Sequence, residues 1–143
     1  MSETTKKRPE FRNINAFADL PSYRWPLAAL VSGMHRISGL LIFILLPFIV
    51  WMFDTSVTSE ISFARFTSIF SEGAGFLPGW FIKLVTLGLI WAYLHHFIAG
   101  IRHVYFDISH QTTKTRGRHT AAITIILAFG LTAILGAKLF GLY

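Results

Sequence analysis

The sequence predicts an all-α membrane protein with three transmembrane helices and a cytoplasmic N-terminus. Of its 143 residues, 53% are hydrophobic and only 14% are charged, whereas about a quarter of the residues of a soluble domain are charged. Three runs contain no Asp, Glu, Lys or Arg, and they cover residues 37–53, 84–101 and 119–137. About 20 helical residues cross a hydrocarbon core of ~30 Å. Each run, together with its flanking residues, is therefore long enough to span a membrane.

The placement of charge predicts the orientation of the spans. The formal net charge is +6, and most of it lies before the first run and between the second and third runs. This is the positive-inside pattern, which places both basic segments in the cytoplasm and the acidic segment outside. It accounts for the charge without a nucleic-acid partner. The basic residues are Lys6, Lys7, Arg8, Arg12, Arg24, Lys114, Arg116 and Arg118, and the outer segment has Asp54, Glu60 and Glu72 against Arg65.

The chain accordingly divides into a cytoplasmic arm over residues 1–26 and a three-helix anchor domain over residues 27–143. Pro26 is expected to be the first residue of the first helix, where its missing N–H costs nothing. The arm lacks the Arg- and Ser-rich, acid-poor composition of a mitochondrial presequence, which favours a bacterial inner membrane over a mitochondrial one. The three spans are expected near Leu27–Phe53, Trp80–Phe106 and Ala121–Leu142.

The two connections between spans differ in character. In the segment Ser59–Phe70, Phe63, Phe66 and Phe70 follow helical spacing, which predicts a short amphipathic helix on the outer membrane surface. The segment His110–His119 is polar and is expected to be a cytoplasmic loop.

Ionisable residues inside a span are costly, so they indicate function unless another explanation is found. On the first helix, Ser32, His35, Arg36 and Gly39 lie at i, i+3, i+4 and i+7 and share one face. The simplest alternative for Arg36 is an interface anchor whose charged end reaches the water layer. With no cysteine in the chain, c-type haem, disulfides and thiolate-held iron–sulfur clusters are excluded here.

His96, near the middle of the second helix, is the candidate metal ligand. A neutral imidazole in hydrocarbon needs a partner for each ring nitrogen, and iron coordination supplies one. The small residues Ala92, Ala99 and Gly100 are expected to make room for a flat porphyrin beside it, as around a b-type haem. The alternative is a histidine hydrogen-bonded to a neighbouring helix, which is the favoured interpretation of the adjacent His95.

A haem that only carries electrons needs a second axial ligand. His103 shares its helix with His96, two turns away, so both cannot bind one iron. The remaining candidates are His35, at a compatible depth, and a histidine from a different subunit.

Two segments resemble the signatures of a known family. Residues 32–39 (SGMHRISG) resemble the S-x-x-H-R-x-[ST]-G signature of the succinate dehydrogenase cytochrome b subunit, and residues 96–107 (HFIAGIRHVYFD) resemble its H-x-x-x-G-I-R-H-x-x-x-D signature. Residues 8–9 (RP) and 23–26 (YRWP) also match, with a longer spacer than the family has. The order of the motifs, the three spans and the length agree over most of the chain.

The resemblance implies a role for each motif residue. His96 would be the axial ligand of the haem b iron, with a histidine of the other membrane anchor as the second ligand. His35, Arg36 and His103 would neutralise the haem propionates, and Ser32 and Arg36 would line the ubiquinone site. Succinate, a tricarboxylic acid cycle intermediate, would be oxidised on a flavoprotein subunit with FAD. An iron–sulfur subunit would pass the electrons on, because this chain has no succinate-oxidising residues.

Two other functions remain open on the sequence. One is a cytochrome b anchor of another quinone-linked dehydrogenase, either self-contained through His35 and His96 or docked on a different partner. The other is a non-redox membrane scaffold whose histidines are structural.

Overall fold

The computed structural model describes residues 13–143, which are helical apart from their connections and one isolated bridge between Ala74 and Leu77. Lys6, Lys7, Arg8, Arg12 and the match at residues 8–9 lie outside the described residues. The helices are α1 (Ala16–Asp19), α2 (Leu27–Ile44), α3 (Leu46–Val57), α4 (Glu60–Ser68), α5 (Gly79–Ser109) and α6 (Lys114–Leu139).

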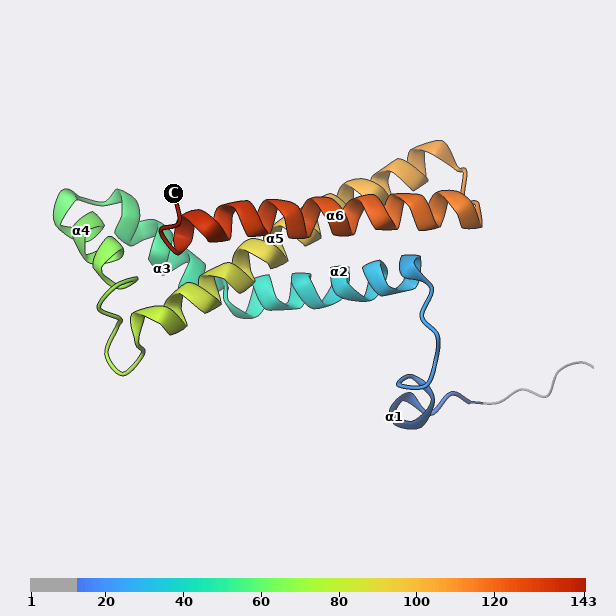
Figure 1. The fold of residues 1–143 in the computed structure, drawn as a ribbon, viewed down its shortest axis with the longest axis horizontal. Helices are drawn as coiled ribbons and strands as arrows, with labels where there is room; N and C mark the ends of the chain where they lie inside the picture. The colour runs from blue at the N-terminus through green and yellow to red at the C-terminus, as the bar shows by residue number, and fades with distance from the viewer. Residues whose placement is uncertain (1–12) are drawn as a thin grey trace, which may run out of the picture.

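Three of these helices are long and apolar enough to cross a membrane, namely α2, α5 and α6. They run alongside one another, and α3 is a shorter apolar helix at one end of them (Figure 1). The three-span, all-α prediction is therefore confirmed, and the chain is a multi-pass membrane protein.

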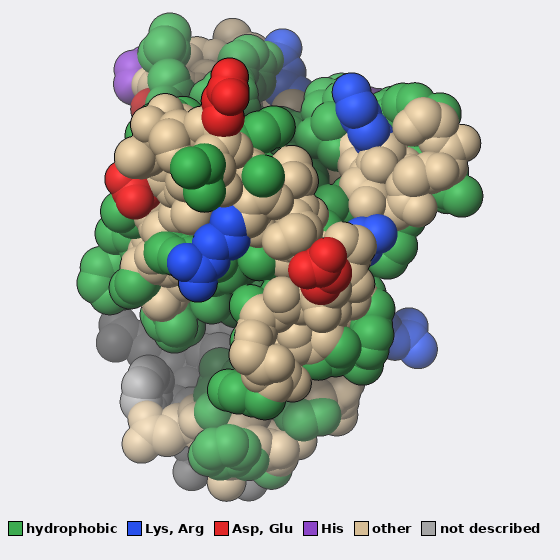
Figure 2. Space-filling model, turned by 90° about the vertical axis from the view of Figure 1, so that its left-hand side faces the viewer, with side chains coloured by type: hydrophobic (Ala, Val, Ile, Leu, Met, Phe, Trp, Pro, Cys, Tyr) green, Lys and Arg blue, Asp and Glu red, His purple; other side chains and the backbone are tan. Residues whose placement is uncertain are grey.

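The ends of the bundle differ. The start of α2 and the connection between α5 and α6 lie at one end, while α3, α4 and the C-terminus lie at the other (Figure 1). The segments that were predicted to share the cytoplasmic side therefore lie at the same end of the molecule. Figure 2 looks onto the opposite end, where acidic and basic side chains are mixed among apolar and other polar ones.

The first predicted span, Leu27–Phe53, is not one continuous helix. Leu45, between α2 and α3, has ψ 6°, which departs from helical geometry. Pro47 follows in the first turn of α3. A proline inside a helix has no N–H to donate and its ring displaces the preceding turn, which kinks the helix. Helical hydrogen bonding continues up to the break, since the N–H of Leu45 donates to the carbonyl of Leu41 at 3.0 Å.

Two helix ends also differ from expectation. Pro26 caps α2 and its carbonyl accepts from the N–H of Ala29 at 2.9 Å, so the helix proper starts one residue later. The polar loop expected over His110–His119 is a loop only before α6, because Thr113 caps that helix and accepts a hydrogen bond from the N–H of Arg116. Polar residues that looked like a loop therefore form the first turns of α6.

The predicted short helix between the first and second spans is confirmed as α4. Ser59 caps it through a reciprocal pair of hydrogen bonds with Ser62, a capping arrangement that satisfies two otherwise unpaired N–H groups. The ring centroids of Phe63 and Phe66 lie 6.1 Å apart, and those of Phe66 and Phe70 lie 5.4 Å apart. The three rings therefore form one stripe, as their spacing predicted. Its placement on the outer surface stays a prediction.

Small residues let the long helices approach closely. Val31 on α2, Ala99 on α5 and Ala121 on α6 are all fully buried and form one cluster. Further along, a Cβ added at Gly136 of α6 would lie 2.7 Å from Leu87 Cδ1 on α5. Most large apolar side chains, by contrast, point outward from the three helices.

Candidate functional site

Three of the predicted site histidines come together between α2 and α5. The rings of His35 and His96 are stacked, with centroids 4.2 Å apart and planes 12° from parallel. The His103 ring lies 5.1 Å from the His35 ring, on the side of the C-terminal end of α5. The spacing on each helix predicted a polar face, and the packing of α2 against α5 turns those two faces toward each other.

The contacts of His96 define how its ring is held. Its Nδ1 lies 3.1 Å from the carbonyl oxygen of His35, and 3.4 Å from the Oγ of Ser38. Because a carbonyl only accepts, Nδ1 must carry the hydrogen and donate it. The other nitrogen, Nε2, is then the one with a free lone pair, and no hydrogen bond to it is formed within residues 13–143. That is the nitrogen available to a metal.

His96 also lines an open apolar groove along the outside of α5. The groove has a volume of about 360 Å³ and is lined by His96, Phe97, Gly100, Ile101 and Val104. A Cβ added at Gly100 would meet only His35 Nε2, at 3.9 Å. Gly100 therefore leaves room beside His96, as predicted.

The predicted role of Ala92 and Ala99 is wrong. Both side chains are fully buried in the helix packing, and Ala99 contacts the cluster of Val31 and Ala121. These alanines are small because α5 packs closely on its neighbours, and they do not line the groove beside His96.

His95 is completely buried and faces the bundle interior. Its Nε2 lies 3.5 Å from the carbonyl oxygen of Val31, and its ring stacks on Trp91 at 5.5 Å. Its Nδ1 has no partner within the described residues. The favoured interpretation of His95 as a histidine bonded to a neighbouring helix agrees with these contacts.

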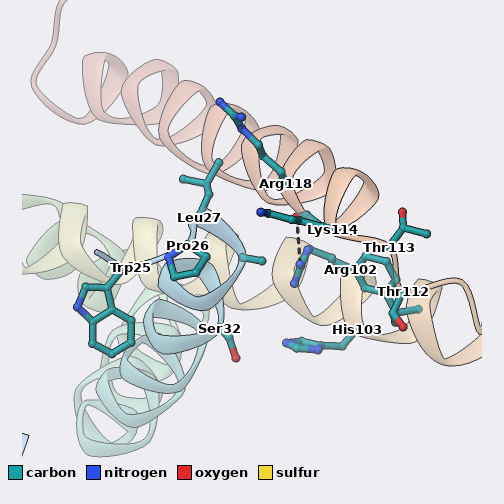
Figure 3. A pocket seen from close by; sticks show the side chains of 13 residues that line it. Trp25, Pro26, Leu27, Ser32, Arg102, His103, Thr112, Thr113, Lys114 and Arg118 are labelled. Atoms are coloured by element: carbon teal, nitrogen blue, oxygen red, sulfur yellow. Dashed lines mark hydrogen bonds between the residues drawn. The ribbon is translucent and has the colours of Figure 1, made fainter. Parts of the chain in front are cut away.

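A larger pocket opens where α2 begins, α5 ends and α6 begins (Figure 3). Its volume is about 900 Å³. Ser32 and His103 line it, so the structure brings two predicted site residues to one cavity. The other lining residues are Trp25, Pro26, Leu27, Ala28, Arg102, Phe106, Thr112, Thr113, Lys114, Gly117 and Arg118.

Arg102 is a residue of this pocket that the sequence reasoning did not select. Its Nε donates to Thr120 Oγ1 at 3.0 Å, its Nη2 donates to the Gly117 carbonyl at 3.4 Å, and its guanidinium lies 4.9 Å from the centre of the Phe106 ring. It thus joins α5 to α6 and gives the pocket a fixed cation (Figure 3). Its position inside the second signature was the signal that could have identified it.

Arg36 does not line this pocket. It lies one turn after Ser32 on α2, but its side chain is exposed and forms no hydrogen bond or ion pair within residues 13–143. The half-buried Ser32 and the exposed Arg36 therefore share a helix face but have different surroundings in the isolated chain.

Comparisons with known proteins agree with this architecture. A family model described as the succinate dehydrogenase/fumarate reductase transmembrane subunit matches residues 4–135. The succinate dehydrogenase cytochrome b556 subunit of Coxiella burnetii is 30% identical over 111 residues, which are 78% of this chain and 84% of that protein. The protein of the same description from Paracoccus denitrificans is 34% identical over 88 residues, which are 62% of each chain. With three apolar helices and a family match over most of its length, the chain belongs to the succinate dehydrogenase/fumarate reductase transmembrane subunits, as a cytochrome b subunit.

Proposed function

We propose that this chain is the haem b-binding membrane anchor of a bacterial succinate dehydrogenase, with His96 as the axial ligand of the haem iron. The observation that carries the proposal is the hydrogen bond from Nδ1 of His96 to the carbonyl of His35. A ligating histidine usually donates its second ring N–H to a carbonyl or carboxylate, which fixes the tautomer that binds metal. The open groove beside His96 and Gly100 provides an apolar wall for a flat group.

The second axial ligand comes from a partner subunit in this proposal. Two imidazoles on opposite sides of one iron point their nitrogens toward each other. The rings of His35 and His96 instead lie face to face, 12° from parallel. This geometry speaks against the self-contained cytochrome with His35 as the second ligand, and the outward-facing groove is where another anchor helix would bring its histidine.

The remaining predicted residues take roles that suit their positions. The His35 ring stacks on His96 and also lies 5.1 Å from the His103 ring, and with Arg36 these two histidines would neutralise the haem propionates. The haem, when bound, supplies a reversible one-electron carrier. His96 holds it, while Phe97 and Ile101 keep water away from the same groove.

Ubiquinone reduction would use the pocket next to Ser32. Reduction places negative charge on the quinone oxygens before two protons arrive. A serine hydroxyl can donate to a quinone carbonyl, and an arginine stays cationic and stabilises a developing anion. Ser32 and Arg102 both line the pocket, whereas Arg36 would complete the site once a partner subunit covers it.

Substrate oxidation belongs to partner subunits. In the proposed complex a flavoprotein with FAD oxidises succinate, and an iron–sulfur subunit carries electrons to the quinone. This chain and the second anchor hold them at the inner membrane among its lipids. The scaffold alternative accounts for the Nδ1 hydrogen bond of His96 to the neighbouring helix, but not for the open groove beside its ring.

The test compares the two adjacent histidines in the purified complex. His96→Ala should lose the reduced-minus-oxidised b-type absorbance, because the metal-binding nitrogen is removed. His95→Gln should keep it, since His95 contacts only the bundle interior. A normal haem spectrum in His96→Ala, or loss only in His95→Gln, would contradict the assignment. Co-purification of a flavoprotein with the wild-type chain distinguishes succinate dehydrogenase from the alternatives.

A further inference from the structure

The His96 ring rests on a glycine of the opposite helix. A Cβ built on Gly39 would lie 2.9 Å from Cε1 of His96 and 3.2 Å from its Nδ1. Side chains do not come that close, and the obstructed group is a rigid ring held by a hydrogen bond. Only glycine therefore fits at position 39 as long as the His96 ring stays in its present position.

The same glycine exposes the acceptor for Nδ1. In a helix the Cβ of a residue tilts toward the N-terminus, over the turn before it. A Cβ at position 39 would therefore stand beside the carbonyl of His35, one turn earlier, which accepts from His96 Nδ1 at 3.1 Å. The fully buried Ser38 donates to that carbonyl at 2.9 Å and keeps it oriented.

We propose that Gly39 is a positioning residue for the metal-binding histidine: it leaves the space in which the His96 ring is held against the His35 carbonyl. The inference rests on the proposed haem function of His96 for its purpose, but the geometry of the ring does not depend on it. A donated Nδ1–H raises the basicity of Nε2 and favours the oxidised iron. Gly39 thereby sets both the direction and the donor strength of the ligand.

The first experiment replaces Gly39 with alanine in the intact complex. Gly39→Ala should push the ring from its acceptor, lowering the affinity for haem on the order of 10-fold and raising the midpoint potential of the haem that remains. Gly33→Ala, on the same helix, is the matched control, because a Cβ added at Gly33 would meet nothing within 4 Å. A wild-type haem content and midpoint potential in Gly39→Ala would overturn the proposal.

The second experiment is a double-mutant cycle whose readout is the stability of the complex and not its haem content. The thermal stability of the complex is measured for Gly39→Ala alone, for His96→Ala alone and for both changes together. If Gly39 only makes room for the ring, the loss of stability or assembly caused by Gly39→Ala should disappear in the His96→Ala background. An equal loss in both backgrounds would mean that Gly39 serves helix packing instead, and the proposal would be wrong.

The two experiments separate the failure of this inference from the failure of the proposed function. Retention of normal haem by His96→Ala would remove the haem role and leave the stability cycle to decide the role of Gly39. Loss of haem in His96→Ala, with no coupling between positions 39 and 96, would keep the haem role and reject the positioning.

Discussion

Ser32 offers the most direct test of the proposed quinone site. It is half-buried on the wall of a pocket of about 900 Å³, and its hydroxyl forms no hydrogen bond within residues 13–143. Ser32→Ala therefore removes a donor without leaving a protein partner unpaired. A hydrogen bond to a charged or developing anion contributes ~1.5–3 kcal/mol. Expressed fully in the transition state, that corresponds to a roughly 10- to 150-fold slower reaction.

Arg36→Leu should be at least as damaging as Ser32→Ala. The arginine is exposed in the isolated chain, so its effect should appear only in the assembled complex, where a partner subunit lowers the dielectric around it and strengthens its interactions. Arg36 is also permanently charged, so it would stabilise both proposed anions, the reduced quinone and a haem propionate.

The assay compares two acceptors in the purified complex. Succinate-dependent ubiquinone reduction should fall in both variants, while reduction of an artificial dye that takes electrons upstream should persist. Ser56→Ala and Arg65→Leu are matched controls at the opposite end of the bundle, on α3 and α4, and should leave both reactions unchanged. Wild-type quinone reduction in Ser32→Ala and Arg36→Leu would refute the site, and an equal loss of the dye reaction would indicate failed assembly instead.

Two further predictions concern topology and packing. Single cysteines placed at Ser71 and Thr113 should differ in intact cells, with only the one at Ser71 labelled by a membrane-impermeant reagent; labelling at Thr113 would overturn the predicted orientation. Gly136→Val should destabilise the α5–α6 contact by about 1–3 kcal/mol, because a Cβ there already reaches 2.7 Å from Leu87 Cδ1. Gly130→Val, where a Cβ meets nothing within 4 Å, provides the comparison, and equal melting temperatures of the two complexes would contradict the packing.

The sequence was sufficient for the parts of the fold that depend on composition. Uncharged runs of the right length predicted the three helices, and helical spacing predicted both α4 and the polar faces that carry His35 and His96. These features are local, so each can be recognised within a few turns of one helix.

The features that could not be predicted from the sequence depend on which helices pack against each other. Ala92 and Ala99 looked like space for a porphyrin, because small residues favour any close approach, and only the packing shows that another helix occupies it. Arg102 could not be selected from the sequence, because its hydrogen-bond acceptors, Thr120 and Gly117, lie on α6. Pro47 is the residue that could have indicated the break at Leu45, but the uncharged apolar run continues across it and favoured one continuous helix.

The length of α5 has a consequence for everything attached to it. Its 31 residues correspond to about 46 Å, against a hydrocarbon core of ~30 Å. Such a mismatch is relieved by tilting or by extension into the headgroup layers. If α5 is centred in the bilayer, His96 near its middle would lie at the best-insulated depth, and Arg102 and His103 would lie toward the headgroup layer. In that arrangement one helix would connect an insulated interior to an accessible surface, and a change of a single turn in its length would shift both relative to the bilayer.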